Sequence, residues 1–103
     1  MNTPGGIVHV VLTQWRGDTP REALAELRAM ISRFPTEIPG VVSAVEGASV
    51  STEGLEAGYD WALVVTFADA AARDGYLPHP AHAPVAAVIG EWAERLVVFD
   101  LDA

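Results

Sequence analysis

Residues 59–67 read Tyr-Asp-Trp-Ala-Leu-Val-Val-Thr-Phe and form the clearest β-strand pattern in the chain. Successive side chains of a strand point to opposite faces of a sheet. The larger apolar residues therefore share one face, which carries Trp61, Leu63, Val65 and Phe67. The other face carries Ala62, Val64 and Thr66 and is also largely apolar. This matters because a strand that meets water on one side normally has a polar face there.

The segments before this strand predict a strand, a helix and a second strand. Residues 7–15 are rich in β-branched residues and predict the first strand. A capping box of Thr19 and Glu22, with Pro20 in the first helical position, predicts the start of a helix. The buried stripe of this helix comprises Leu24, Leu27, Ile31 and Phe34, and Phe34-Pro35 is expected to end it. After a turn at residues 38–40, residues 41–50 predict the second strand.

The segments after residues 59–67 predict two helices and a last strand. Asp69 is expected to cap a helix of residues 70–77, and Pro80 to open another that runs to about residue 93. Residues 95–101 predict the final strand. The order is β-α-β-β-α-β with the second helical part split, which is the ferredoxin-like arrangement. We therefore predict one α+β domain over residues 1–103, with a four-stranded antiparallel sheet.

The apolar faces of the strands predict a partner for the sheet. In this topology the helices cover one face, yet the first, third and fourth strands are apolar on both. A large exposed apolar patch is unusual on a monomer that meets water. The simplest resolution is a homodimer in which the sheet faces of two copies pack across a two-fold axis. The alternative is a sheet that tolerates a few exposed apolar residues.

Composition excludes several classes of function. The chain has no cysteine, so disulfides and a cysteine nucleophile are excluded, and no lysine, so a Schiff base is excluded. A net charge of −8 argues against nucleic acid as a partner. No apolar run is long enough to cross a membrane, and residues 1–6 lack the basic start of a signal peptide. We therefore expect a soluble cytoplasmic protein.

Residues 76–82 read Tyr-Leu-Pro-His-Pro-Ala-His and are the most distinctive segment. Further segments accompany it along the chain: Ile7–Leu12, Ile38–Val41, Glu53-Gly54, Gly58–Asp60, Val65–Phe67 and Phe99-Asp100. Together they resemble the stress-responsive A/B barrel family, or Dabb domain, over nearly the whole length. The resemblance implies a ferredoxin-like protomer that dimerises into an α/β barrel, in agreement with the sheet pattern.

The resemblance implies a range of functions rather than one activity. Many members of the family have no assigned activity, and several bacterial relatives look like polyketide-tailoring cyclases. The plant member olivetolic acid cyclase closes a linear polyketide by aldol condensation. It uses a tyrosine and a histidine that match Tyr76 and His82 here. Fold alone does not determine function, so any activity depends on the chemistry of these residues.

Tyr76 and His82 are the predicted catalytic residues. The residue before a proline avoids the α region, so His79 is expected near the N-cap, Pro80 at the first helical position and His82 near the third. The positive end of a helix dipole disfavours imidazolium, so His82 should be a neutral base near pH 7. The Tyr76 hydroxyl could donate to a substrate carbonyl and stabilise an enolate or alkoxide. Both residues could instead serve packing alone.

His9, His79 and Trp61 are the predicted substrate-binding residues. His9 of the first strand could line the same cavity as Tyr76, or it could be a hydrogen-bonded core histidine. His79 could be a helix cap. Trp61, like Trp15 and Trp92, could belong to the core or the interface, because aromatic residues bury large areas.

We predict no metal and no cofactor. His79 and His82 are three residues apart, but a zinc site needs at least three protein ligands. His9 or an acidic residue such as Asp100 would have to complete it, so the signal is weak. A Gly-rich phosphate loop, a Rossmann fingerprint and a Gly-x-Ser-x-Gly motif are all absent.

Two hypotheses for function remain. The first is a cofactor-independent polyketide cyclase or lyase acting on an apolar or aromatic small molecule, with His82 as base and Tyr76 as hydrogen-bond donor. The second is a non-catalytic, stress-related dimer that binds a ligand or has a structural role. A pocket beside Tyr76 and His82 would favour the first, and sealed side chains the second.

Overall fold

Four antiparallel strands form one sheet in the computed structural model, which describes residues 5–103. Residues 1–4 of the predicted domain lie outside the described residues. The strands are β1 (Ile7–Trp15), β2 (Val41–Ala48), β3 (Trp61–Phe67) and β4 (Ala93–Asp102). Their order is β2-β3-β1-β4, so the first and last strands of the chain are neighbours, and β2 and β4 form the edges. The predicted α+β ferredoxin-like fold is confirmed.

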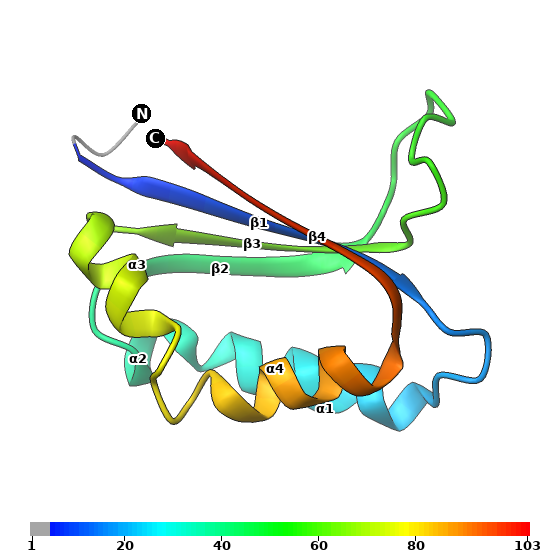
Figure 1. Ribbon diagram of the computed structural model, residues 1–103, viewed down its shortest axis with the longest axis horizontal. Helices are drawn as coiled ribbons and strands as arrows, with labels where there is room; N and C mark the ends of the chain where they lie inside the picture. The colour runs from blue at the N-terminus through cyan, green and yellow to red at the C-terminus, as the bar shows by residue number, and fades with distance from the viewer. Residues whose placement is uncertain (1–4) are drawn as a thin grey trace.

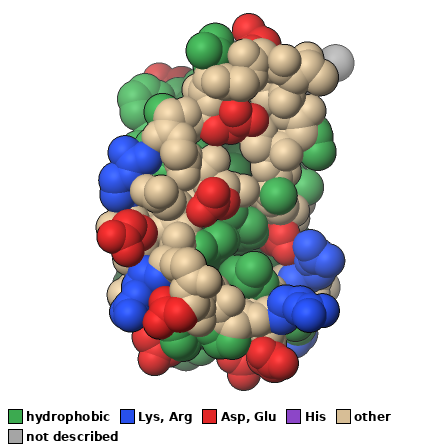
Figure 2. Space-filling model, turned by 90° about the vertical axis from the view of Figure 1, so that its right-hand side faces the viewer, with side chains coloured by type: hydrophobic (Ala, Val, Ile, Leu, Met, Phe, Trp, Pro, Cys, Tyr) green, Lys and Arg blue, Asp and Glu red, His purple; other side chains and the backbone are tan. Residues whose placement is uncertain are grey.

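All helices lie on one side of the sheet (Figure 1). They are α1 (Arg21–Ser32), α2 (Phe34–Glu37), α3 (Ala70–Tyr76) and α4 (Ala83–Trp92). We call the sheet face toward them the inner face and the opposite one the outer face. The loop of residues 49–60 rises on the outer side, at one end of the sheet (Figure 1). Figure 2 views the molecule from that end and shows hydrophobic side chains at its centre, among acidic and basic ones.

The core lies between the inner face and the helices. Its strand residues include Ile7, Val11, Trp61, Leu63, Val65 and Phe67, and its helical residues include Leu27, Ile31 and Phe34. The strand residues alternate with half-buried ones on β1 and β3, as the period-two pattern predicts. Trp15 follows a register shift after Gln14, and its ring centroid lies 5.2 Å from that of Trp61.

The start and end of the first helix differ from the prediction. α1 begins at Arg21, with Pro20 in the N-cap position and no side-chain cap. The Thr19 hydroxyl instead donates to the Arg16 carbonyl at 2.6 Å and closes the preceding turn, so the predicted capping box is wrong. The helix ends at Ser32, and Phe34-Pro35 starts the separate short helix α2.

The segment before α4 also differs from the prediction. The Asp69 cap is confirmed, since its carboxylate accepts the Ala72 N–H at 2.8 Å. However, α4 begins at Ala83 with His82 as its N-cap, three residues after Pro80. Residues 79–82 form their own turn, in which His79 Nδ1 accepts the Ala81 N–H at 3.0 Å and the His79 carbonyl accepts the His82 N–H at 2.9 Å.

Gly40 occupies a position that no other residue fits, and replacing it tests the connection between α2 and β2. Its φ is +84°, and a Cβ atom there would lie 2.3 Å from the Cβ of Ala72 on α3. We expect Gly40→Ala to lower the free energy of unfolding by about 3 kcal/mol, measured by urea denaturation. Gly17→Ala is the control, because a Cβ there meets nothing within 4 Å, and its effect should stay within about 0.5 kcal/mol. Equal effects for the two variants would contradict this account.

The outer face carries apolar side chains from all four strands. One row across the sheet, set by the strand register, consists of Val45, Val64, Val10 and Phe99. Phe99 is 62% exposed. Within residues 5–103, all of the helices cover the other side (Figure 1). The protomer therefore presents to solvent a strip of side chains that normally belong to an interior.

Candidate functional site

A pocket of about 210 Å³ lies between the inner face and α4. Its lining residues come from every part of the fold except α1, α2 and β2: His9, Val11, Leu63, Tyr76, Leu77, His82, Val85, Ala86, Ile89, Gly90, Leu96 and Val98. This described lining contains no lysine, arginine, aspartate or glutamate. Three of the five predicted site residues, Tyr76, His82 and His9, meet here.

The Tyr76 ring packs against four rings, which belong to His9, Phe34, Phe67 and His82. It is the last residue of α3 and is 1% exposed. Its ring centroid lies 4.3 Å from that of His82, 5.6 Å from that of His9 and 5.0 Å from that of Phe67. Burial raises the pKa of its hydroxyl far above the ordinary value, so the hydroxyl keeps its proton. No hydrogen-bond partner among residues 5–103 takes that proton, which leaves it for a ligand.

His82 has one ring nitrogen fixed and the other open. Its Nδ1 lies 3.0 Å from the Leu77 carbonyl, and a carbonyl accepts, so Nδ1 carries the proton and Nε2 of the neutral ring has a lone pair. Burial lowers the pKa of His82, and the nearby His9 lowers it further, against the opposing effect of the Leu77 hydrogen bond. The neutral state agrees with the prediction, but its main cause is burial rather than the helix dipole.

His9 belongs to a hydrogen-bonded chain that local sequence patterns do not predict. The β1–β4 register places His9 opposite Asp100, and His9 Nδ1 donates to the Asp100 carboxylate at 2.6 Å. The second carboxylate oxygen accepts from Arg73 of α3 at 3.0 Å. Burial opposes ionisation of Asp100, but the hydrogen bonds and charges of His9 and Arg73 outweigh it and lower the pKa. Asp100 therefore orients His9 so that Nε2 is its open nitrogen.

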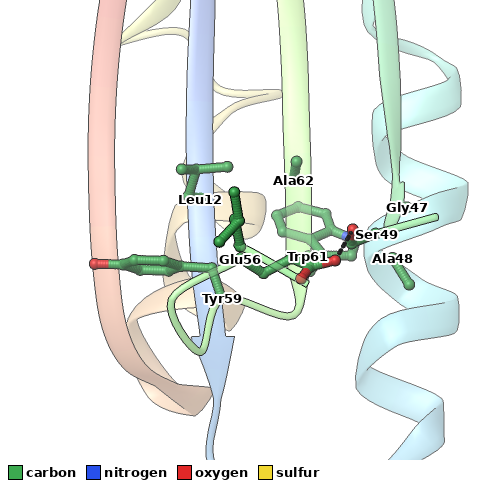
Figure 3. Close-up of a pocket in the computed structure, with 9 residues that line it drawn as sticks. Leu12, Gly47, Ala48, Ser49, Glu56, Tyr59, Trp61 and Ala62 are labelled. Atoms are coloured by element: carbon green, nitrogen blue, oxygen red, sulfur yellow. Dashed lines mark hydrogen bonds between the residues drawn. The ribbon is translucent and has the colours of Figure 1, made fainter. Parts of the chain in front are cut away.

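The other two predicted site residues lie elsewhere. His79 borders a shallow hollow beside Pro39, Gly40 and Asp69 and uses Nδ1 for the turn at Ala81. Trp61 lines a hollow of about 290 Å³ under the loop of residues 49–60 (Figure 3). The structure thus separates His79 and Trp61 from the pocket of Tyr76, and their binding roles stay predictions.

The hollow at Trp61 lies on the outer side of the sheet. Leu12 and Ala62 form its floor, and Tyr59 and Glu56 of the loop stand over them (Figure 3). The Ser49 hydroxyl donates to the Glu56 carboxylate at 2.5 Å. Arg95 braces the loop from β4, since its guanidinium donates to the Ala57 carbonyl and lies 4.5 Å from the centre of the Tyr59 ring.

Residues 5–103 contain no group of three or more histidine, cysteine, aspartate or glutamate side chains that could hold a metal ion. Over the same residues, every helix is too short or too polar to traverse a bilayer.

The pocket therefore combines two imidazoles with a hydroxyl in an apolar enclosure. Each imidazole has Nδ1 fixed by the protein and Nε2 available, and the Tyr76 ring packs against both. A neutral imidazole can accept a proton, and a protonated hydroxyl can donate to an oxygen that gains charge. The arrangement has the parts needed for proton transfer next to a carbonyl group.

Comparisons with known proteins agree with this fold. A structure from Jannaschia sp. CCS1, described as a dimeric ferredoxin-like protein of unknown function, is 24% identical with a TM-score of 0.87, over 96% of this chain and 100% of that one. The Arabidopsis thaliana protein At3g17210 is 26% identical with a TM-score of 0.82, over 94% of each chain. The hydroxynitrile lyase from Passiflora edulis is 17% identical with a TM-score of 0.84, over 95% of this chain and 93% of that one.

A comparison with curated proteins finds no sequence match. Residues 7–103, nearly the whole chain, match the stress responsive A/B barrel domain (Dabb). The match includes both strands that carry His9 and Asp100 and the segment from Tyr76 to His82. The chain therefore belongs to the stress responsive A/B barrel domain family.

Proposed function

We propose that this protein is a cofactor-independent enzyme of the polyketide cyclase or lyase kind, which moves a proton next to the carbonyl group of a small neutral molecule. The observation that carries the proposal is the pocket itself. It brings together, in an apolar cavity, the rings of His82 and Tyr76, whose Nε2 and hydroxyl have no hydrogen-bond partner among residues 5–103. A base and an oxyanion donor are the minimum set for enolate chemistry.

The proposed reaction uses three groups. His82 Nε2 removes a proton from the carbon next to the carbonyl, and the electron pair moves onto the carbonyl oxygen. The Tyr76 hydroxyl donates to that oxygen and stabilises the enolate. In a cyclisation, the enolate carbon attacks a second carbonyl of the same molecule, a carbon–carbon bond forms, and the imidazolium of His82 returns its proton to the new alkoxide. His9, fixed by Asp100, holds a polar group of the substrate by a hydrogen bond at its open Nε2.

Two measurements test the proposal. The first follows exchange of α-protons of 2-butanone in D2O by NMR, which reports proton removal alone. The second analyses the products from linear poly-β-keto thioesters, which reports ring closure. We expect both to exceed the rate in buffer. If the exchange rate and the product distribution match those in buffer, the protein is a non-catalytic, ligand-binding dimer instead.

Tyr76→Phe tests the hydroxyl alone. The ring contacts with Phe34, Phe67, His9 and His82 stay, so the fold should be unchanged. Removal of one donor to a developing oxyanion costs about a hundredfold in rate or more, and we expect that loss in kcat for exchange. The double variant Tyr76→Phe, Phe34→Tyr has a phenol in the core at a different position. It should not recover the rate of α-proton exchange. A Tyr76→Phe variant with wild-type kcat would remove Tyr76 from the reaction.

We also propose that two copies pair through the outer faces of their sheets. The support is the uncovered apolar strip that runs from Val45 to Phe99 across the four strands. A second copy would cover it with the same side chains, as a two-fold axis requires. The neighbour from Jannaschia, which is described as dimeric, has the same fold.

A further inference from the structure

Asp100 has two partners on different elements, and one of them carries a permanent charge. Its Oδ1 lies 2.6 Å from His9 Nδ1, and its Oδ2 accepts from the Arg73 guanidinium at 3.0 Å. Burial opposes ionisation of Asp100, but both partners lower its pKa, so it is a carboxylate at neutral pH. The His9 side chain is 6% exposed, whereas those of Arg73 and Asp100 are each 28% exposed. A negative charge therefore lies directly behind a buried imidazole of the pocket.

Either partner could supply the positive charge that balances Asp100. A guanidinium is always charged in a protein, whereas an imidazole becomes charged only when it binds a second proton. A carboxylate whose sole partner is a histidine favours the imidazolium form of that histidine. Here the charge of Arg73 is already present, so it balances Asp100 and also repels a second proton on His9. The neutral form of His9, with a lone pair on Nε2, is favoured as a result.

The titratable groups around His9 show which charge it responds to. Asp100 lies opposite His9 on β4, the Tyr76 ring of α3 packs edge-on against it, and His82 interacts with it electrostatically. Tyr76 keeps its proton, because burial raises the pKa of its hydroxyl. His82 is the neutral base, because burial lowers its pKa. The ionised groups next to His9 are therefore Asp100 and, behind it, Arg73.

The short helix α3 brings Arg73 to this position. It lies at the end of the sheet where the chain begins and ends (Figure 1). Arg73 is one helical turn before Tyr76, so its bond to Asp100 joins the helix that carries Tyr76 to the strand behind His9. Arg73 Nε also donates to Asp74 at 2.9 Å, but the Asp74 side chain is 70% exposed and water screens its charge.

We infer that Arg73 is a positioning residue that keeps His9 neutral by supplying the charge that balances Asp100. Arg73 does not line the pocket and acts through Asp100. The consequence reaches His82, whose pKa is lowered by burial and by the nearby His9. An imidazolium at His9 would lower that pKa further and make His82 a weaker base. The neutral state of His9 follows from the contacts above, whereas its effect on the base rests on the proposed function.

The test is the protonation of His9, measured by 15N NMR without a substrate. A bare and a protonated imidazole nitrogen have well separated shifts, and His9→Gln identifies the signals. Arg73→Gln keeps a hydrogen-bond donor for Asp100 but removes the charge. At a pH of about 6.5 it should raise the ratio of protonated to neutral His9 about tenfold over wild type. Arg73→Lys keeps the charge and should stay within about threefold of wild type.

Arg33→Gln is the matched control, because it removes the same charge from an ion pair with Glu37 that lies outside the pocket. It should leave the His9 signals unchanged. Wild-type His9 signals in Arg73→Gln overturn the inference, and a lower melting temperature in that variant would then make Arg73 a structural clamp alone. An equal rise in Arg73→Lys also overturns it, since the charge is kept there. If Arg73→Gln does not fold, Arg73→Leu takes its place, with the same tenfold rise expected.

The failure of this inference and that of the proposed function are distinguishable. A tenfold rise in protonated His9, with no α-proton exchange by the wild-type protein, keeps the role of Arg73 and overturns the reaction. If the wild-type protein exchanges α-protons, Arg73→Gln should slow exchange most below a pH of about 6.5, where His9 takes up its proton. A decrease that is the same at all pH values would show that Arg73 does not act through the charge of His9.

Discussion

His82→Gln is expected to slow α-proton exchange by about a hundredfold to ten-thousandfold, the usual contribution of a positioned base. Glutamine can keep a hydrogen bond to the Leu77 carbonyl but has no nitrogen that accepts a proton. The effect should appear in kcat, because the side chain keeps a similar size and the apolar lining stays. An unchanged melting temperature is the check that the fold survives. A His82→Gln variant with wild-type exchange would assign the base to His9.

The pH dependence of α-proton exchange in the wild-type protein tests the same role of His82 as the base. Burial lowers the pKa of His82 below its ordinary value, so the neutral base is present at neutral pH. Exchange should therefore rise with pH through a pKa below about 6.5 and then level off. At pH values between the pKa of His82 in the folded protein and about 6.5, the unfolded chain binds more protons than the folded one. The contribution of His82 to stability is therefore lost as the pH falls below about 6.5.

Phe99→Glu is expected to separate the proposed dimer. In the two-fold arrangement each substitution occurs twice, and it removes an aromatic contact and places a carboxylate in an apolar interface. A loss of about 2 kcal/mol at each copy raises the dissociation constant roughly a thousandfold. Analytical ultracentrifugation over a concentration series measures it. The protomer itself should stay folded, because Phe99 is already exposed in it.

Val98→Glu is the matched control for the dimer. Val98 is the neighbour of Phe99 on the same strand and has a similar exposure, but it points to the helix side of the sheet. It should leave the mass in solution unchanged. A wild-type mass equal to one chain, or equal dissociation in both variants, would contradict pairing through the outer face.

The sequence predicts the sheet because burial alone determines its pattern. Trp61, Leu63, Val65 and Phe67 all face the core, as their spacing requires. Helix starts are less predictable because they depend on competing hydrogen bonds. Thr19 has the right side chain for an N-cap, yet its hydroxyl is used by the Arg16 carbonyl. Pro20 occupies the N-cap rather than the first helical position. Pro80 lies in the turn of residues 79–82, which precedes the first residue of α4.

The site was predictable only where its residues are close in the sequence. Tyr76 and His82 are six residues apart, and the segment that contains them indicates their proximity. The His9–Asp100 pair depends on the register between β1 and β4, which local patterns do not determine. The sequence suggests Asp100 only as a possible metal ligand, whereas in the structure it is bound to His9 and Arg73. The β-α-β-β-α-β order was the available signal, because it places the first and last strands side by side.

The hydrogen bond between His9 and Asp100 spans 91 positions of the chain, and this separation has a consequence for the newly made protein. Ribosomes deliver residues in order, so β1 emerges early and must wait until β4 has left the exit tunnel. Until then His9 has no carboxylate to fix its tautomer, and the neighbouring pocket lacks Leu96 and Val98 as a wall. A nascent chain that has already collapsed around β1 and β3 would still be without an assembled site. The pocket is thus completed only after β4 has emerged and paired with β1.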